Sequence, residues 1–96
     1  MAYDAVILGA GPAGLAVAHA MGRAGAKVKV LEPAGQVGGS IRTHLDAGWI
    51  VETGPNTLQL EGPEDEALMA AYGLSEVMQS ADMRAARRYI FARGEL

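Results

Sequence analysis

The sequence predicts an α/β fold that is organised around one strand–helix–strand unit near its beginning. The apolar run Ala5–Leu8 predicts a first strand, and a second apolar run, Val28–Leu31, predicts another. Between them a glycine-rich turn leads into a stretch of small residues with helical spacing, and Glu32 follows the second strand directly. This order of elements is typical of a Rossmann-like βαβ unit that binds a dinucleotide.

Each glycine of the turn has its own physical role. Gly9 permits the sharp turn out of the strand, Gly11 leaves room for a pyrophosphate beside the backbone, and Gly14 lets the helix pack closely on the strand. Pro12 suits the first helical position, because an N–H group is not needed there. The start of the helix then offers free N–H groups and a partial positive charge to the phosphates. The predicted phosphate site is the whole turn: Gly9, Ala10, Gly11, Pro12, Ala13 and Gly14.

The helix is predicted from about Pro12 to Ala24, with Gly25 as its left-handed stop. Its sheet-facing side is predicted as one apolar stripe, formed by Ala13, Ala16, Val17, Ala20 and Met21. At the carboxyl end of the second strand, Glu32 is placed to accept hydrogen bonds from both hydroxyls of a ribose. A carboxylate there would repel a 2′-phosphate, which disfavours NADP.

A second glycine motif follows the second strand. Residues Pro33 to Gly39 form a loop that ends in the pair Gly38-Gly39, and Ser40 and Arg42 come shortly after it. Paired glycines let the backbone pass close to a bulky group, and Arg42 is placed to contact the phosphates or the ring system of a cofactor. An ordinary surface turn is the alternative interpretation of this segment.

Beyond this loop, the sequence predicts a β-hairpin, a rigid turn and a second helix. The strands Thr43–Leu45 and Trp49–Glu52 are joined by Asp46–Gly48, which has a glycine near the turn. Gly54–Thr57 then breaks the pattern with a polar turn. A helix is predicted over about Asp65–Tyr72, acidic at its start and stopped by a glycine.

The last segment is predicted to be an incomplete hairpin. Arg88–Ala92 predicts a strand, Arg93-Gly94 a turn, and Glu95-Leu96 the first residues of a returning strand. Because such a hairpin leaves an unpaired backbone edge, we expect the chain to be the N-terminal part of a longer polypeptide. We expect residues 1–62 to form the nucleotide-binding unit with the following hairpin and loop, and residues 63–96 to begin a second, truncated domain.

Composition narrows the function classes. The 96 residues carry a formal net charge of −3 and include no cysteine. The charge argues against a nucleic-acid surface, and the missing cysteine excludes a disulfide framework, a Cys-ligated metal site and a redox dithiol. The first strand lies at the start of the sequence, so no signal or transit peptide is expected, and no apolar run approaches the ~20 residues of a membrane span. We therefore expect a cytoplasmic protein.

Two sets of motifs resemble a known family. The first set is Gly9–Leu15, Leu31-Glu32 and Gly38–Thr43. The second set is Glu52–Thr57, Arg88–Phe91 and Gly94. The first set resembles the flavin amine oxidase superfamily. The second set resembles the N-terminal part of the FAD-dependent protoporphyrinogen oxidases within that superfamily. The resemblance extends over all 96 residues, and those enzymes are several times longer. The implied fold is the Rossmann-like FAD-binding βαβ unit, with an added hairpin and helices, of a larger two-domain flavoprotein.

The resemblance implies FAD as the cofactor and implies which segments of the chain would contact each part of it. The turn Gly9–Gly14 would hold the pyrophosphate, and Glu32 with Pro33 would meet the adenosine ribose. Ser40 and Arg42 would line the flavin side, together with the glycine pair Gly38 and Gly39 before them. The isoalloxazine and ribityl chain would be followed by Gly54, Pro55, Asn56 and Thr57.

The resemblance also implies a substrate and partners. Arg88 matches an arginine that pairs with a propionate of the tetrapyrrole in this family, and a solvated strand-end charge is the alternative. The implied reaction is oxidation of protoporphyrinogen IX or coproporphyrinogen III in heme biosynthesis, with oxygen as acceptor. The partners would be the tetrapyrrole, oxygen and the remainder of the flavoprotein, and peripheral association with a membrane is open. The chain alone would not be catalytically competent.

Because the chemistry would belong to the flavin, we predict no catalytic residue and no metal ligand in this chain. Two alternative functions stay open. One is another enzyme of the superfamily, an amine oxidase or a carotenoid desaturase. The other is a nucleotide-binding module without catalysis.

Overall fold

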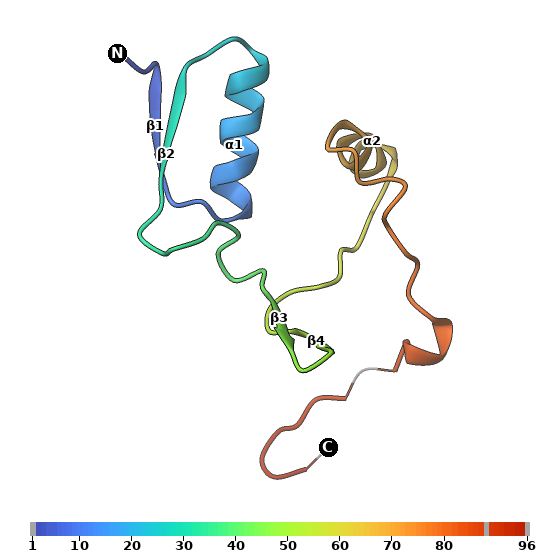
Figure 1. Cartoon of the computed structure of the whole chain (residues 1–96). Helices are drawn as coiled ribbons and strands as arrows, with labels where there is room; N and C mark the ends of the chain where they lie inside the picture. Colours follow the sequence, from blue (N-terminus) through green and yellow to red (C-terminus); the bar gives the residue numbers. More distant parts are fainter. Residues whose placement is uncertain (1, 88, 96) are drawn as a thin grey trace. The chain divides into compact units, whose positions relative to one another are not determined.

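The computed structural model describes residues 2–87 and 89–95. Contacts divide this part of the chain into two compact units, one up to Leu58 and one from Gln59 onward. The first unit contains β1 (Ala5–Leu8), α1 (Pro12–Arg23), β2 (Val28–Leu31), β3 (Thr43–Asp46) and β4 (Trp49–Glu52) (Figure 1). The second contains α2 (Pro63–Ala71) and a short 3-10 helix, η1 (Met83–Ala85). That the second unit begins a substrate domain stays a prediction.

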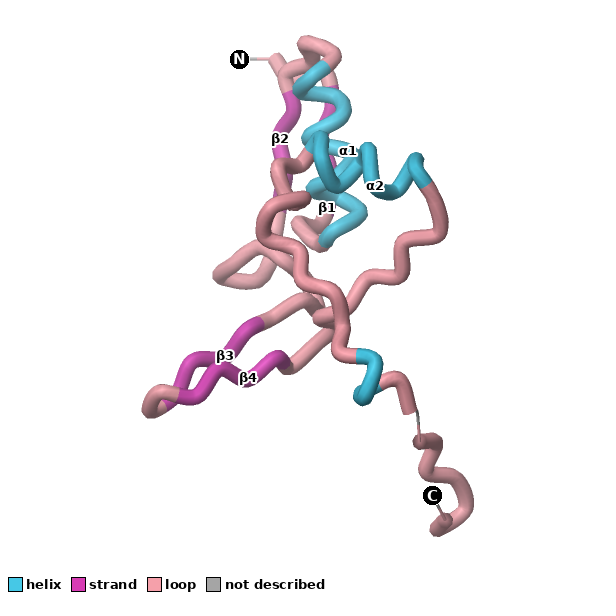
Figure 2. The backbone as a smooth tube through the Cα atoms, turned by 90° about the vertical axis from the view of Figure 1, so that its right-hand side faces the viewer, coloured by secondary structure: helices cyan, strands magenta, loops and turns pink. Residues whose placement is uncertain are grey.

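The strands β1 and β2 are parallel, and α1 connects them and packs on both (Figures 1 and 2). Their register runs from Ala5 opposite Val28 to Leu8 opposite Leu31. At the amino ends of the strands, the Asp4 carboxylate accepts the Lys27 N–H group at 2.7 Å. The predicted α/β fold class with a βαβ unit is therefore confirmed.

The helix α1 begins and ends close to the predicted positions. Gly11 precedes it and Pro12 occupies its first turn. It ends at Arg23, and Gly25 adopts φ +87°, the left-handed conformation that a helix stop of this kind requires. The N–H group of Ala26 then donates to the carbonyl of Met21 at 3.0 Å, which turns the chain toward β2.

The predicted sheet-facing side of α1 was wrong in part. Ala16 and Met21 are half-buried as expected, but Ala13, Val17 and Ala20 are exposed. Gly14 and Ala18 are half-buried as well, and the predicted close packing at Gly14 is present. At this contact an added Cβ would overlap the Gly9 carbonyl oxygen and lie 3.4 Å from Cγ2 of Ile7. The residue without a side chain, rather than the most apolar stripe, decides which side of the helix meets the strand.

The predicted hairpin is present. The strands β3 and β4 pair antiparallel, from Thr43 opposite Glu52 to Asp46 opposite Trp49 (Figure 2). Its two-residue turn has positive φ at both positions, 45° at Ala47 and 87° at Gly48. This is the turn geometry that matches the natural twist of a hairpin. Asp46 belongs to β3 and not to the turn.

In the second unit, the predicted helix is present and the late strand is not. The helix α2 begins at Pro63, slightly earlier than predicted. Within residues 89–95, ladder pairing is limited to one bridge between Ala92 and Glu95, which encloses the predicted turn. Tyr89–Phe91 are exposed and form no strand, because β-propensity alone does not make a strand where no described residue pairs with them. Arg88 lies outside the described residues.

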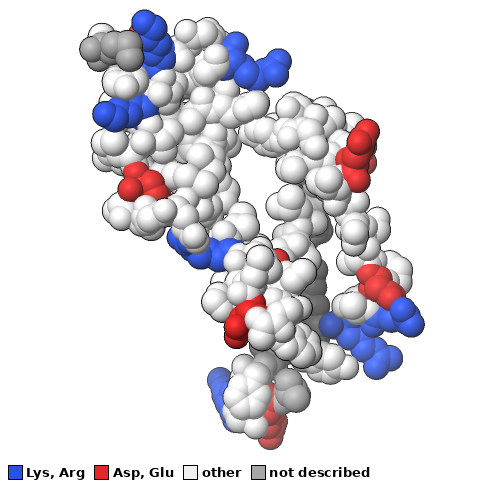
Figure 3. All heavy atoms as spheres, viewed as in Figure 1, with Lys and Arg blue, Asp and Glu red and all other residues white. Residues whose placement is uncertain are grey.

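Few side chains are fully buried. Among the described residues, Ala10 is the one buried hydrophobic residue, at 1% exposure. On the face drawn in Figure 3, acidic and basic side chains are interspersed among much larger uncharged areas. No helix in the described part of the chain combines the length and the apolar character needed to span a bilayer.

Candidate functional site

The candidate site lies at the carboxyl ends of β1 and β2. Because the strands are parallel, these ends meet at one edge, and the Gly9 N–H group continues the ladder by donating to the Leu31 carbonyl at 2.7 Å. The chain leaves β1 through the glycine turn and leaves β2 at Glu32. In open α/β sheets, ligands bind outside the carboxyl ends of the strands.

The Glu32 carboxylate is held by two backbone donors. Its Oε2 accepts the Ala10 N–H group at 2.7 Å, and its Oε1 accepts the Ala34 N–H group at 2.8 Å. The bond from Ala10 is the largest cause that lowers the pKa of Glu32 below its ordinary value; the bond from Ala34 and the charge of Arg42 also lower it. Glu32 is therefore ionised at neutral pH. Each carboxylate oxygen has a second lone pair, so both can still accept a hydrogen bond from a ligand.

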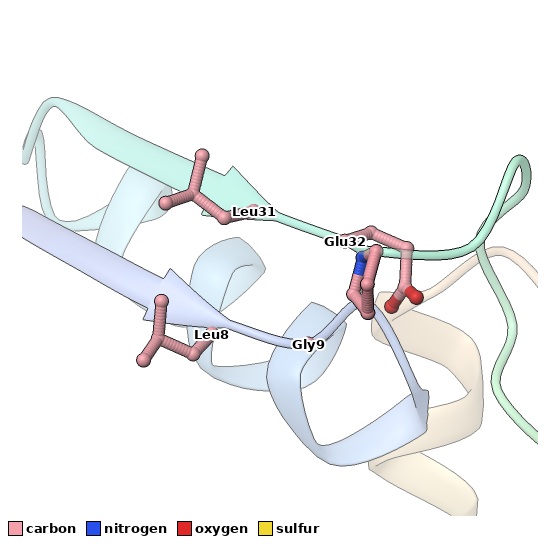
Figure 4. A pocket seen from close by; sticks show the side chains of 5 residues that line it. Leu8, Gly9, Leu31 and Glu32 are labelled. Atoms are coloured by element: carbon pink, nitrogen blue, oxygen red, sulfur yellow. The ribbon is translucent and has the colours of Figure 1, made fainter.

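Beside Glu32 lies an open pocket of about 550 Å³ (Figure 4). It is lined by Leu8, Gly9, Leu31, Glu32 and Pro33. The side chains of Leu8 and Leu31 are 81% and 44% exposed, so the wall is mostly apolar with one carboxylate at its end. This combination suits a flat, partly apolar group that carries hydroxyls, such as a nucleoside.

The two leucines were not among the predicted site residues. Along each strand, half-buried and exposed residues alternate, and Leu8 and Leu31 are the exposed final residues. Because alternate residues of a strand lie on the same face, Lys29 on the exposed face of β2 was a sequence signal for Leu31, whereas the all-apolar β1 gave none for Leu8.

The glycine turn leaves its backbone open. Gly11 has extended backbone dihedrals (φ −74°, ψ 178°), and no side chain caps the first N–H groups of α1. A Cβ added at Gly11 would meet only Cα of Gly39, at 3.9 Å, an ordinary contact. The protein's own packing therefore does not require a glycine at position 11. The space and the uncapped helix start suit an anionic group.

The second glycine motif lies against this turn. The Gly38 N–H group donates to the Ala10 carbonyl at 2.8 Å. A Cβ added at Gly39 would lie 3.1 Å from Cα of Gly11, so the two backbones nearly touch. The Arg42 side chain is half-buried, and its Nε donates to the Gly39 carbonyl at 3.0 Å. The structure thus brings together the turn 9–14, Glu32 and the loop 38–42.

The third predicted segment connects to the second. The Thr53 N–H group donates to the Arg42 carbonyl at 2.9 Å, and half-buried Gly54 lies against the backbone of Ser40. The residues that follow, Pro55, Asn56 and Thr57, are exposed and have no regular secondary structure. Their flavin contacts stay predictions, as does the substrate role of Arg88. In the described part of the chain, no three His, Cys, Asp or Glu side chains are grouped to hold a metal ion.

Comparison with known proteins identifies the relatives of this chain. The family described as "Flavin containing amine oxidoreductase" matches residues 12–96. The L-amino-acid oxidase of Echis ocellatus is 38% identical over 87 residues, which cover 82% of this chain and 16% of that protein. Protoporphyrinogen oxidase 2, chloroplastic/mitochondrial, of Arabidopsis thaliana is 36% identical over 88 residues, which cover 92% of this chain and 17% of that protein.

A solved structure shows the same local fold. Wild-type putrescine oxidase bound to putrescine is 38% identical, with a TM-score of 0.58, over 74% of this chain and 15% of that chain. The matches cover 16%, 17% and 15% of the lengths of these three proteins, so the chain spans about one sixth of each.

These matches confirm the prediction of FAD, and the residues at this edge fit it. The ionised Glu32 can still accept hydrogen bonds from ribose hydroxyls, and the mostly apolar pocket beside it suits a nucleoside. The space beside Gly11 and the uncapped start of α1 suit a pyrophosphate. Glu32 and Pro33 would therefore hold the adenosine end, and the turn 9–14 would hold the phosphates.

Proposed function

The chain belongs to the family of flavin-containing amine oxidoreductases, and we propose that it provides the FAD-binding part of an oxidase that acts on a porphyrinogen. The observation that carries the FAD-binding role is the bridge from Glu32 to Ala10, which joins the carboxyl end of β2 to the turn after β1. It fixes a carboxylate beside a backbone that is open to an anion.

In this proposal the chain binds and orients. FAD, when bound, supplies the hydride acceptor for substrate oxidation and is then reoxidised by oxygen. Glu32 accepts hydrogen bonds from the ribose hydroxyls while its own position is fixed by two backbone donors. Arg42, bonded to the Gly39 carbonyl, keeps a positive charge near the same edge. No proton transfer is assigned to these residues.

The porphyrinogen substrate is supported by motif and coverage. The match to protoporphyrinogen oxidase 2 of Arabidopsis thaliana extends over 92% of this chain. The residues Glu52–Thr57 and Arg88–Phe91 resemble that branch of the superfamily. In this proposal the partners are the tetrapyrrole, oxygen and the remainder of a flavoprotein. The proposed location of the protein is the cytoplasm, either free or in peripheral contact with a membrane.

Oxidation of an amine or an amino acid is the second candidate. The L-amino-acid oxidase of Echis ocellatus and the putrescine oxidase structure are each 38% identical to this chain, a level similar to that of the protoporphyrinogen oxidase. The described site residues of this chain would hold the cofactor with either class of substrate. The substrate therefore has to be determined by experiment.

The test is anaerobic reduction, by a panel of substrates, of the flavin-loaded full-length flavoprotein that contains this chain. Protoporphyrinogen IX, coproporphyrinogen III, L-amino acids and putrescine are mixed with it separately, and loss of the visible flavin absorption is followed. We expect bleaching by a porphyrinogen. Bleaching by amino acids or putrescine alone would overturn the porphyrinogen assignment and support the second candidate.

Arginine variants sharpen this test. If Arg88 pairs with a propionate, Arg88→Ala should lower kcat/KM for the porphyrinogen about tenfold to a hundredfold through KM, while flavin content stays unchanged. Arg87→Ala removes the same charge one residue earlier and should have a much smaller effect. Equal effects of both variants would remove the substrate role of Arg88.

A further inference from the structure

Gly54 lies directly against the backbone of Ser40. A Cβ added at Gly54 would overlap the Ser40 carbonyl oxygen, and it would lie 2.8 Å from the carbonyl carbon of Ser40 and 3.5 Å from Cα of Ile41. All three are backbone atoms, so no side-chain rotation relieves the overlap. Gly54 is also not among the glycines with positive φ, so its backbone conformation is open to any residue. The contact with Ser40, and not the backbone conformation, requires glycine here.

The hairpin brings Gly54 to this position. The β3–β4 pairing ends with Thr43 opposite Glu52, and the Thr43 hydroxyl donates to the Glu52 carboxylate at 2.9 Å. One residue further, the Thr53 N–H group donates to the Arg42 carbonyl at 2.9 Å. Gly54 therefore meets the loop 38–42 at the base of the hairpin, where the two chain segments separate.

The other side of the loop 38–42 lies against the phosphate-binding turn. Gly38 donates to the Ala10 carbonyl, and Gly39 nearly touches Gly11. The loop is thus held between two backbone contacts, one with the turn 9–14 and one with Gly54. A shift of the Ser40 carbonyl, two residues from Gly38, would be passed to the turn.

We propose that Gly54 is a positioning residue for the cofactor site. Its missing side chain lets the base of the hairpin dock on Ser40, and this docking sets the position of the loop 38–42 against the pyrophosphate-binding turn. Gly54 acts through Ser40, whereas the family resemblance implies only a direct contact with the flavin. The inference rests on the proposed FAD-binding role of the chain.

The experiment compares Gly54→Ala with Gly35→Ala. Gly35 is also a loop glycine without positive φ, and a Cβ added there meets nothing within 4 Å. FAD affinity is measured by quenching of flavin fluorescence, and the visible circular dichroism of bound flavin reports its surroundings. Trypsin cleavage after Arg42, measured without FAD, reports whether the loop 38–42 is displaced.

We expect Gly54→Ala to bind FAD about tenfold more weakly, the scale of an overpacked backbone contact, with an altered flavin dichroism. We also expect faster cleavage after Arg42 in the cofactor-free protein, while Gly35→Ala behaves like wild type. Weaker FAD binding with unchanged cleavage would mean a direct flavin contact and would overturn the positioning role. Wild-type behaviour of Gly54→Ala would overturn it as well.

Two other outcomes are distinguishable. If Gly54→Ala does not fold, amide hydrogen exchange of the wild type decides: FAD should slow exchange at Gly38 and Thr53 together, on both sides of the loop, but not at Gly48 in the hairpin turn. A change at Gly38 alone would overturn the inference. If the full-length wild-type flavoprotein that contains this chain takes up no FAD, the proposed function fails, and the cleavage after Arg42 still decides whether Gly54 positions the loop.

Discussion

Gly14→Ala tests how closely α1 packs on β1. The added Cβ would overlap the Gly9 carbonyl oxygen and lie 3.2 Å from its carbonyl carbon. The obstructing group is backbone at the start of the glycine turn, so the helix itself has to move. Gly22 lies in the same helix, also without positive φ, and a Cβ added there meets nothing within 4 Å.

Two opposing terms set the size of the effect. Alanine is favoured over glycine inside a helix by about 0.5–1 kcal/mol, which alone would stabilise both variants. Overpacking against a fixed neighbour costs about 1–3 kcal/mol. At Gly14 the steric term exceeds the helical gain, and we expect a net loss of about 1–2 kcal/mol in the free energy of unfolding. At Gly22 only the helical gain applies, so we expect no loss or a small increase.

The assay is urea and thermal unfolding of both variants, followed by far-ultraviolet circular dichroism in the absence of FAD. For a domain of this size, each kcal/mol corresponds to about 4–8 °C in Tm. Gly14→Ala should therefore melt several degrees below wild type, and Gly22→Ala should not. If Gly14→Ala were as stable as Gly22→Ala, the close packing of α1 on the turn would be refuted.

Three further predictions address the site and the hairpin. Gly11→Val should abolish FAD binding in a fluorescence titration, because its branched side chain would occupy the space of the pyrophosphate. Gly11→Ala should leave unfolding of the cofactor-free protein nearly unchanged, because a Cβ at position 11 meets only one protein atom, 3.9 Å away; a large loss of stability in Gly11→Ala would contradict this. Glu32→Gln should be less stable than wild type near neutral pH, since an amide group has to face one of the two backbone donors. Because folding lowers the pKa of Glu32, the stabilisation by its carboxylate is present above the ordinary glutamate pKa of about 4.3 and is lost as the pH falls through the lower folded pKa. The difference between the urea midpoints of wild type and Glu32→Gln should therefore shrink on acidification and should not grow. Ala47→Asn should raise the stability of the hairpin by about 0.5–1 kcal/mol, because asparagine tolerates the φ of 45° better than alanine, and an unchanged or lower unfolding midpoint would count against it.

The elements that depend on local pattern could be predicted from the sequence. Both strands of the βαβ unit, the start of α1 and the hairpin follow from apolar runs and from Pro12, Gly25 and Gly48. In these cases the residue acts through its own backbone. The Glu32 carboxylate could be placed at the site because parallel strands end at one edge.

The features that depend on contacts between distant segments could not be predicted. The close packing at Gly14 was predicted, but the exposure of Ala13, Val17 and Ala20 on the predicted apolar stripe was not. The bond from Ala10 to Glu32 uses a backbone N–H group, and such groups leave no mark in a sequence. The prediction of a late strand over Arg88–Ala92 was wrong for its described residues, because β-propensity alone does not supply a pairing partner.

The separation of paired residues along the chain also bears on the order in which the first unit folds. In the hairpin, the Thr43–Glu52 pair is nine residues apart, whereas Asp4 and Lys27 at the end of the parallel strands are 23 apart. Closing the longer loop costs more chain entropy, and hairpins form in about 1–10 μs, ahead of non-local parallel pairing. We therefore expect β3–β4 to form before β1–β2, although it comes later in the sequence. The phosphate-binding turn would then close against an existing hairpin base, which makes the cofactor site one of the last parts of the unit to mature.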